Sequence, residues 1–265
     1  MNLTNKNIWI TGASSGIGKA LAIEISKYKP TLILSSRNNN ELLKTKNICE
    51  KNGAKCFIQL LDLSKPHEIK QIADTIINKF DKIDILINNG GISQRSLAEE
   101  TNINIDRNIM EINFFGNISL TKAVLPNMIK NKSGQILTVS SIVGKFGFPL
   151  RSAYSASKHA LHGFYESLRA EVEKKHNIKV KIIIPGRIKT NISYNSIQKD
   201  GTKYNKMDEG QEKGMTAEKC AKKIIKAIKK NKKEILIGKK ELIMVYIRIF
   251  FPRIFYNIVN KIKTT

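Results

Sequence analysis

A glycine-rich turn close to the N-terminus restricts, more than any other feature, how this chain can fold. The apolar residues 7–11 run into the turn, and the spacing Gly12-x-x-x-Gly16-x-Gly18 leads directly into apolar positions at helical spacing. A strand, a glycine turn and a helix in this order allow close approach of a phosphate to the backbone. The helix N-terminus adds free N–H groups and the positive end of its dipole. The position of the turn therefore predicts dinucleotide binding, and a turn without a ligand is the simpler alternative.

The rest of the chain continues this alternation of strands and helices. Short apolar runs are separated by segments with helical periodicity, so the sheet should be parallel with helices on both faces. We therefore expect an α/β fold of the Rossmann type, a doubly wound parallel sheet that forms a single domain of residues 1–240. The expected strands are residues 7–11, 31–35, 55–61, 83–87, 135–139, 179–184 and 234–238, and the expected helices include residues 41–51, 66–80, 106–130, 154–176 and 216–230.

The composition excludes several classes of protein. Of 265 residues, 41% are hydrophobic, and the formal charge of +24 comes from 46 basic and 22 acidic residues. The lysines are spread along the chain without an arginine-rich or aromatic-interleaved patch, which argues against nucleic acid as a partner. The three cysteines form no Cys-x-x-Cys pair and the four histidines have no metal-ligand spacing, so we expect no metal.

The compartment follows from the cysteines and from the N-terminus. A small, odd number of cysteines fits a reducing compartment. Residues 1–6 enter the first expected strand at once, which leaves no room for a signal peptide or an N-terminal anchor. We therefore expect a cytoplasmic protein, with a peripheral position on a membrane left open.

The end of the second expected strand indicates which dinucleotide binds. An acidic residue there would bind the 2′-hydroxyl of NAD, but this chain has Ser35, Ser36 and Arg37 and no acid. Arg37 can pair with a 2′-phosphate, and no carboxylate is present to repel that phosphate. We therefore favour NADP(H) as the cofactor; the alternative is a solvated arginine at a strand end.

Tyr154 and Lys158 open the longest expected helix. Their i, i+4 spacing puts both side chains on one helix face. A free tyrosine has a pKa near 10, and a lysine ammonium beside it favours the phenolate and lowers that pKa. The pair therefore suits proton transfer near neutral pH. On its own, such a pair is more often a solvated face of a helix.

Polar or turn-forming residues follow most of the other expected strands. Asp62 ends the third strand, Asn89 follows the fourth, and Ser141 and Pro185 follow the fifth and sixth. Ligands of doubly wound folds bind at these carboxyl ends, although each residue alone is also an ordinary turn residue. Asn113 lies among apolar neighbours in an expected helix, and it either is satisfied in the core or points at a site.

A set of short motifs follows one order along the chain. The motifs are Thr11-Gly12-x-x-x-Gly16-x-Gly18, Asp62, Asn88-Asn89-Gly90-Gly91, Asn113, Ser141, Tyr154-x-x-x-Lys158 and Pro185-Gly186-x-x-x-Thr190. With these motifs the chain resembles the short-chain dehydrogenase/reductase family over residues 5–240. Gly90 departs from the alanine that is usual in the family. Residues 90–96 are similar to a branch that includes membrane-associated reductases related to 11β-hydroxysteroid dehydrogenase.

The resemblance implies a role for each motif residue. Tyr154 would be the general acid/base, and Lys158 would lower its pKa and hold the nicotinamide ribose. Ser141 would hydrogen-bond the substrate oxygen, and Asn113 would hold a water of a proton relay. The other positions would bind the cofactor: Gly12, Ser14, Ile17 and Arg37 at the phosphates and the adenosine end, Asp62 and Leu63 at the adenine, Asn89 at the adjacent ribose, and Pro185, Ile188 and Thr190 at the nicotinamide.

Two functions are compatible with these residues. The first is an NADP-dependent oxidoreductase that transfers a hydride between NADP(H) and a small carbonyl or alcohol substrate. The second is a non-catalytic NADP-binding regulator or scaffold, because a fold alone does not settle function. A regulator would be free to lose Ser141, Tyr154 or Lys158, and this chain keeps all three. The resemblance also implies a homo-oligomer, a dimer or a tetramer.

Two further segments lie outside the regular alternation. Residues 191–214 are polar and follow a strand end, which predicts a mobile lid or an ordinary surface loop. Residues 241–265 mix large apolar side chains with basic ones, and Pro252 should kink or end a helix there. Their uncharged runs are shorter than a membrane span needs. This segment suits an anionic membrane surface, or it packs on the domain or on a second subunit.

Overall fold

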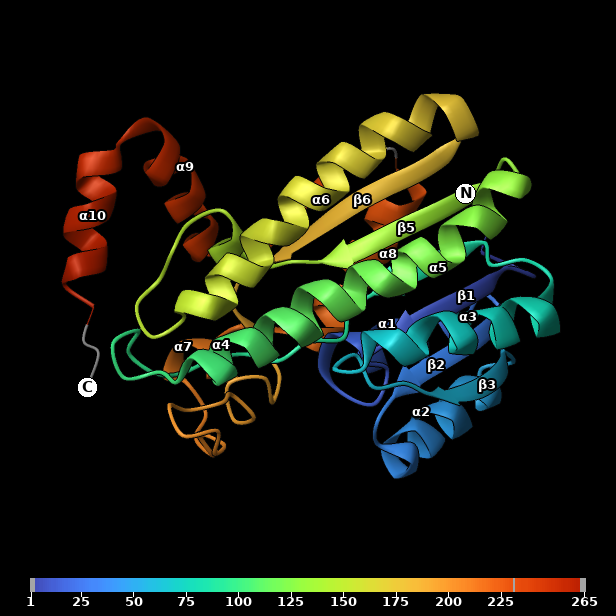
Figure 1. Ribbon diagram of the computed structural model, residues 1–265, viewed down its shortest axis with the longest axis horizontal. Coiled ribbons are helices and arrows are strands. Elements are labelled where there is room, and N and C mark those ends of the chain that lie inside the picture. Colours follow the sequence, from blue (N-terminus) through green and yellow to red (C-terminus); the bar gives the residue numbers. More distant parts are fainter. Residues whose placement is uncertain (1–2, 231, 263–265) are drawn as a thin grey trace.

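The computed structural model describes residues 3–230 and 232–262. A sheet of seven parallel strands lies at its centre, in the order β3-β2-β1-β4-β5-β6-β9. The strands are β1 Asn7–Thr11, β2 Thr31–Ser36, β3 Lys55–Leu60, β4 Ile85–Asn88, β5 Gly134–Val139, β6 Ile178–Pro185 and β9 Glu234–Ile237. The parallel doubly wound sheet predicted from the sequence is therefore confirmed (Figure 1).

Helices cover both faces of this sheet (Figure 1). One face packs against α1, α2 and α8, and the opposite face against α3, α5 and α6. These helices are α1 Gly16–Ser26, α2 Asn39–Lys51, α3 Pro66–Phe80, α5 Gly116–Lys130, α6 Ser152–His176 and α8 Ala217–Lys229. Both faces of each central strand are buried, which is why the strands read as continuous apolar runs.

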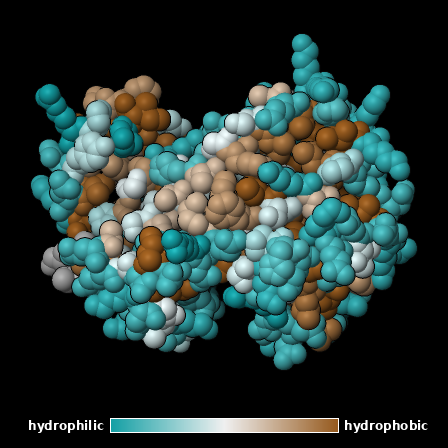
Figure 2. Space-filling view, viewed as in Figure 1, coloured by the Kyte–Doolittle hydropathy of each residue, from teal (hydrophilic) through white to brown (hydrophobic). Residues whose placement is uncertain are grey.

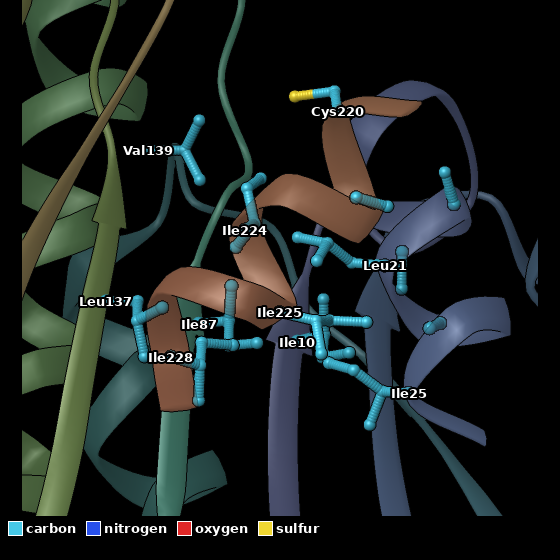
Figure 3. Packing of buried hydrophobic residues seen from close by; sticks show 14 of the residues in the cluster. Ile10, Leu21, Ile25, Ile87, Leu137, Val139, Cys220, Ile224, Ile225 and Ile228 are labelled. Atoms are coloured by element: carbon cyan, nitrogen blue, oxygen red, sulfur yellow. The ribbon is translucent and has the colours of Figure 1, made fainter. Parts of the chain in front are cut away.

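Alternate residues of one strand enter two separate cores. In β1, Ile8 and Ile10 face the helices α1 and α8, whereas Trp9 faces the other layer. Figure 3 shows the first core, in which Ile224 and Ile228 of α8 lie against the strands. Burying each such side chain contributes about 1.5–3 kcal/mol, so these two layers hold the carboxyl ends of the strands in place.

Helix starts agree with the signals in the sequence. Pro66 occupies the first turn of α3, where a missing N–H costs nothing. The Asn38 side chain accepts a hydrogen bond from the Glu41 N–H and caps α2. The Thr216 hydroxyl does the same for α8 by accepting from the Lys219 N–H.

The helix expected over residues 106–130 is interrupted. It comprises α4 Ile103–Met110, a π-helical turn η1 Glu111–Phe115, and α5. One extra residue in a helical turn hardly changes the spacing of the apolar residues, so the sequence did not indicate the π-helical turn. The turn carries Asn113, and π-turns are frequent at functional sites.

The segment of residues 191–214 has little regular structure. It follows β7 Ile188–Lys189, contains α7 Glu209–Glu212, and leads to β8 Met215–Thr216, which pairs with β7 in parallel. In Figure 1 this segment lies beside the carboxyl ends of the strands and below α4.

The C-terminal segment forms a helical hairpin that projects from the domain at the left of Figure 1. It contains η3 Lys240–Leu242, α9 Ile243–Phe250 and α10 Pro252–Asn260. Pro252 begins the second helix, as expected from its effect on the first. Among the helices described, none has the length and apolarity that crossing a membrane requires. Residues 1–2 and 231 of the predicted domain, and residues 263–265 of the C-terminal segment, lie outside the described residues.

Candidate active site

A cavity of about 500 Å³ lies at the carboxyl ends of the central strands. The chain leaves β1 toward β2 and β3 on one side and later returns to β4 on the other, which is the position where such sheets bind ligands. Residues from the glycine turn, from the ends of β4, β5 and β6, and from α6 line it. The predicted site residues on its wall are Gly12, Ile17, Asn89, Ser141, Tyr154, Lys158, Pro185, Ile188 and Thr190.

The glycine turn gives this cavity one wall of bare backbone. Gly12 and Gly16 have φ values of +64° and +52°, a region that side chains disfavour. A Cβ on Gly18 would lie 2.2 Å from the Gly12 carbonyl oxygen, so no side chain fits between α1 and the turn. Ser15 precedes α1, and within the described chain no side chain caps its first N–H groups. Such a helix N-terminus, without an acidic residue in its first turn, accommodates a phosphate.

Thr11 and Asn89 join the ends of β1 and β4. The Thr11 hydroxyl oxygen accepts hydrogen bonds of 3.0 and 2.9 Å from the N–H groups of Asn89 and Gly90. The Asn89 side-chain amide returns a 3.0 Å hydrogen bond to the Thr11 carbonyl oxygen. A Cβ at position 90 would lie 2.6 Å from a terminal methyl of Leu63. Glycine in place of the usual alanine therefore gives that leucine room.

Tyr154 and Lys158 lie one turn apart near the start of α6, and both are buried. The Lys158 ammonium donates a 3.0 Å hydrogen bond to the Val139 carbonyl oxygen at the end of β5. It lies 5.7 Å from the centre of the Tyr154 ring. Burial lowers the pKa of Lys158 to about 8, because an ammonium is poorly stabilised away from water.

The pKa of Tyr154 is set by burial and by its polar neighbours. Burial raises the pKa of Tyr154, and the positive charge of Arg151 and a hydrogen bond with Ser141 offset part of that rise. The sequence predicted that Lys158 would lower this pKa. In the structure the lysine donates to a backbone carbonyl oxygen and burial has the largest effect on the phenol, so that effect of Lys158 stays a prediction.

Ser141 follows β5 and begins the short helix η2 Ile142–Gly144. Its hydroxyl oxygen accepts a 3.4 Å hydrogen bond from the Val143 N–H, which leaves the hydroxyl proton free to be donated into the cavity. The preceding Ser140 points the other way and donates to the Lys158 carbonyl oxygen at 3.2 Å. Both serines line the cavity, but the Ser140 hydroxyl is hydrogen-bonded to the backbone of α6.

Asn113 lies behind the cavity wall and is fully buried. Its side chain accepts a hydrogen bond from the Ile92 N–H at 2.8 Å and donates to the Ile92 carbonyl oxygen at 2.9 Å. It also donates to the Ser157 hydroxyl at 3.0 Å. A Cβ on Gly91 would lie 2.9 Å from the Asn113 side-chain oxygen and 3.6 Å from the Lys158 nitrogen. Only a glycine there brings the two side chains together.

The residues predicted for the adenosine end lie apart from this cavity. Arg37 is exposed and lines an open hollow of about 470 Å³ with Asn38, Asn39 and Asn40. Burial of Asp62 opposes ionisation, but hydrogen bonds from Ser64 and the nearby charge of Arg37 bring its pKa below the usual value. Ser14 and Leu63 are partly buried and do not line either hollow.

Several cavity residues were not identified from the sequence. Phe146, Phe148 and Met244 add apolar surface, and Met244 comes from the C-terminal hairpin. Asp208 forms ion pairs with both Arg95 and Arg151. The Arg151 pair joins residues 191–214 to the start of α6, and the Arg95 pair joins them to the loop after β4. Charged pairs between distant segments leave no local signal, so the sequence could not have indicated them.

Comparison with known proteins gives one consistent result. A profile of the short chain dehydrogenase family matches residues 6–201. The mouse protein "Dehydrogenase/reductase SDR family member 7B" is 40% identical over 261 residues, which are 97% of this chain and 80% of that protein.

Solved structures share the fold. A short-chain dehydrogenase/reductase from Burkholderia phymatum in complex with NAD superposes with a TM-score of 0.84 at 21% identity, over 96% of each chain. An alcohol dehydrogenase from Thermococcus sibiricus complexed with 5-hydroxy-NADP has a TM-score of 0.76 at 23% identity, over 89% of this chain and 97% of that one.

Proposed function

Because this chain belongs to the short-chain dehydrogenase/reductase family, we propose that it is an NADP-dependent oxidoreductase that interconverts a carbonyl and an alcohol. One observation carries the proposal. The hydroxyls of Ser141 and Tyr154 line the same cavity as the bare-backbone wall around Gly12. Two side-chain hydroxyl groups and the glycine turn, which is suited to binding a phosphate, therefore line one cavity.

A dinucleotide would lie with its nicotinamide half in the cavity and its adenosine half beyond it. The uncapped N-terminus of α1 would take the pyrophosphate, Asn89 a ribose, and Pro185, Ile188 and Thr190 the nicotinamide end. Bound NADP(H) supplies the hydride chemistry, and the protein provides orientation and proton transfer. Asp62 and Leu63 would flank the adenine, and Ser14 and Ile17 the phosphates.

Three side chains of this chain would carry the proton chemistry. The Tyr154 phenol donates its proton to the substrate oxygen during reduction, and its raised pKa keeps that proton in place at neutral pH. The Ser141 hydroxyl donates a hydrogen bond to the same oxygen, which stabilises its developing charge. The Lys158 ammonium, anchored on Val139, holds the nicotinamide ribose.

Asn113 would hold a water molecule of a proton relay, through which the active site regains a proton from solvent. Its side chain is fixed on Ile92, and its oxygen approaches the Lys158 nitrogen across Gly91. A water bound near this carbonyl group would connect the lysine to bulk solvent.

The choice of NADP over NAD rests on Arg37. The solved neighbours hold NAD in one case and an NADP derivative in another, so the fold does not decide between them. In this chain β2 ends at Ser36 without an acidic residue, and Arg37 lies exposed beside it. A guanidinium in that position pairs well with a 2′-phosphate.

The substrate half of the cavity favours an apolar carbonyl compound. Phe146, Phe148, Leu150 and Met244 line it, and such side chains bind an apolar body rather than a sugar or a phosphate ester. Residues 191–214 would act as its lid. Asp208 of that segment is paired with Arg95 and Arg151, so breaking these pairs would open the cavity.

The C-terminal hairpin would place the protein on an anionic membrane surface. Its inner side packs on the domain, with Val245 and Phe255 buried against Phe146. Its outer side exposes Ile249 and Phe250, at 63% and 68%, and Figure 2 shows apolar side chains gathered over the hairpin. Residues 216–265 carry 14 basic and 3 acidic residues, and this combination suits an anionic lipid interface. The homo-oligomer that the family implies stays a prediction.

The test is a panel of steroid, retinoid, lipid-derived and small aromatic carbonyls assayed with purified protein by NADPH absorbance. We expect turnover of at least one class, and a loss of about 10²–10⁴-fold in kcat for Tyr154→Phe, with NADPH binding retained. Tyr28→Phe, at a partly buried tyrosine that follows α1 and does not line the cavity, is the matched control. NADPH binding without turnover of any carbonyl, unchanged by Tyr154→Phe, would favour the regulator instead.

A further inference from the structure

A second group of polar side chains lies beside the active-site cavity, on the opposite side of Ser140. It consists of His162 and Glu166 from α6 and Glu234 from β9, whose ligand atoms all lie within 4.8 Å of one another. His162 Nδ1 is 3.6 Å from Glu166 Oε1 and 3.5 Å from Glu234 Oε1. None of these three residues lines the cavity.

The hydrogen bonds of Ser140 fix the tautomer of His162. The Ser140 hydroxyl donates its proton to the Lys158 carbonyl oxygen, which can only accept. Its oxygen therefore accepts from His162 Nε2, 3.1 Å away. The proton of a neutral His162 thus resides on Nε2, and Nδ1 presents a lone pair.

That lone pair faces two carboxylates. His162 is only 7% exposed, and its Nδ1 has no hydrogen-bond partner among the described residues. A lone pair and two anionic oxygens repel one another unless a cation lies between them.

We propose that His162 Nδ1, Glu166 and Glu234 form a zinc site with water as the fourth ligand. Zinc binds imidazole nitrogen and carboxylate oxygen at about 2.0–2.2 Å in tetrahedral geometry, which puts neighbouring ligand atoms roughly 3.3–3.5 Å apart. The two distances from Nδ1 agree with this spacing to about 0.2 Å. Glu166 and Glu234 have side chains 50% and 36% exposed, so an ion can enter from solvent.

The second ring nitrogen supports the same assignment. Metal-binding histidines typically donate their other N–H to an oxygen that fixes the ring. Here His162 Nε2 donates to Ser140, which in turn donates to the Lys158 backbone. The sequence did not indicate this site because two of its ligands are glutamates, and Glu234 lies far from α6 along the chain.

Lys145 competes with the metal. Its ammonium lies 3.0 Å from Glu234 Oε1 and must move when zinc binds. His159 lies on the same helix, and its Nδ1 contacts the Ser155 carbonyl oxygen. Removing the Lys145 charge should therefore tighten zinc binding, whereas removing a ligand should weaken it. If these residues had only a structural role, the two kinds of substitution would not change zinc affinity in opposite directions.

The test uses the full chain, stripped of metal and titrated with Zn²⁺ against a chromophoric chelator. We expect one bound ion. Loss of a residue that only hydrogen-bonds to a metal ligand lowers metal affinity roughly 10- to 100-fold. Glu166→Gln and His162→Ala each remove a ligand itself and should lower zinc affinity by more than that. Lys145→Met should raise zinc affinity. Glu173→Gln, on the same helix but paired with Lys233, is the matched control and should bind as wild type.

Thermal unfolding provides a second readout. Zinc should raise the unfolding temperature of wild type and of Glu173→Gln, and not that of Glu166→Gln, because only a ligand of the native state stabilises it. Circular dichroism checks that each variant is folded. Zinc binding of equal strength in wild type and Glu166→Gln, or its absence in wild type and in Lys145→Met, would overturn the assignment.

Discussion

The side-chain oxygen of Gln94 accepts a 3.3 Å hydrogen bond from the backbone N–H of Tyr154. The same oxygen accepts a 2.9 Å hydrogen bond from the N–H of Ala153. Gln94 is fully buried, and its amide nitrogen donates to the Ser152 and Thr101 hydroxyls. The helix that carries Tyr154 is thus capped by a residue from the loop after β4, which sets the direction in which the phenol points.

Replacing Gln94 should lower both stability and turnover. Gln94→Met removes the cap and leaves two N–H groups unpaired, at a cost of about 1–2 kcal/mol in the free energy of unfolding. We expect kcat to fall about tenfold, with a smaller change in the KM for NADPH. Gln94→Glu keeps the accepting oxygen and faces hydroxyls that can donate to it, so it should recover most of kcat. Equal loss of kcat in both variants would rule out the capping role.

Arg37→Ala should weaken NADPH binding while leaving NADH binding unchanged. A hydrogen bond to a charged group contributes about 1.5–3 kcal/mol, so we expect the dissociation constant for NADPH to rise about tenfold or more. Lys51→Ala removes the same charge from the far end of α2 and is the control. A wild type without a preference for NADPH, or an equal loss for both nucleotides, would contradict the assignment.

The rate of carbonyl reduction should depend on the Lys158 ammonium. Its pKa is lowered to about 8, so the charge is present below about pH 8 and lost above it. Burial raises the pKa of Tyr154, so the phenol keeps its proton over the same range. We expect kcat/KM for NADPH, which reports groups of the free enzyme, to be level below about pH 8 and to fall about tenfold per pH unit above it.

The control for this profile is Lys158→Arg, whose guanidinium stays charged. If that variant keeps measurable activity, its fall should move to higher pH. A wild-type profile that stays level to pH 10 would exclude Lys158 as the group that titrates.

The positions of the central strands and the parallel sheet could be predicted because these strands are buried on both faces. Each of these strands is therefore an apolar run that begins and ends at polar or glycine residues, as at the turn after Thr11. The π-turn at Asn113, the cap that Gln94 provides and the pairing of Asp208 with Arg151 could not be predicted. Each depends on which segments of the chain meet in space, and the local amino-acid composition does not indicate those contacts. The positions of Ser141 and Tyr154 could be predicted because one follows an apolar strand and the other begins the helix after it.

Lys181 should contribute to stability in spite of its burial. Only 2% of this residue is exposed, and its ammonium donates to the carbonyl oxygens of Ala227, Ile228 and Lys230 at 3.0, 3.0 and 2.6 Å. It thereby satisfies carbonyl groups at the end of α8. Lys181→Met leaves them unpaired, and we expect a loss of about 2 kcal/mol, or roughly 4–8 °C in Tm. Lys179→Met, exposed on the same strand, should change Tm little; an equal loss would contradict this role.

The C-terminal hairpin should bind anionic vesicles through its exposed apolar side chains. Ile249 and Phe250 project from the end of α9, at 63% and 68% exposed, with Arg248 on the same helix. Burial in lipid of each such side chain contributes about 1.5–3 kcal/mol. We therefore expect the double variant Ile249→Ser, Phe250→Ser to lower binding about tenfold or more in vesicle sedimentation.

Ile103→Ser is the control for that measurement, because Ile103 is 60% exposed on α4 and lies outside the hairpin. Wild type and this control should sediment with vesicles that contain phosphatidylserine and much less with neutral vesicles. Raising the salt concentration should weaken the anionic component, since exposed charges are screened beyond about a Debye length. If wild type and the double variant remain equally unbound, the outer side of the hairpin has another partner. A dimer that the double variant alone loses would identify that partner as a second copy of this chain.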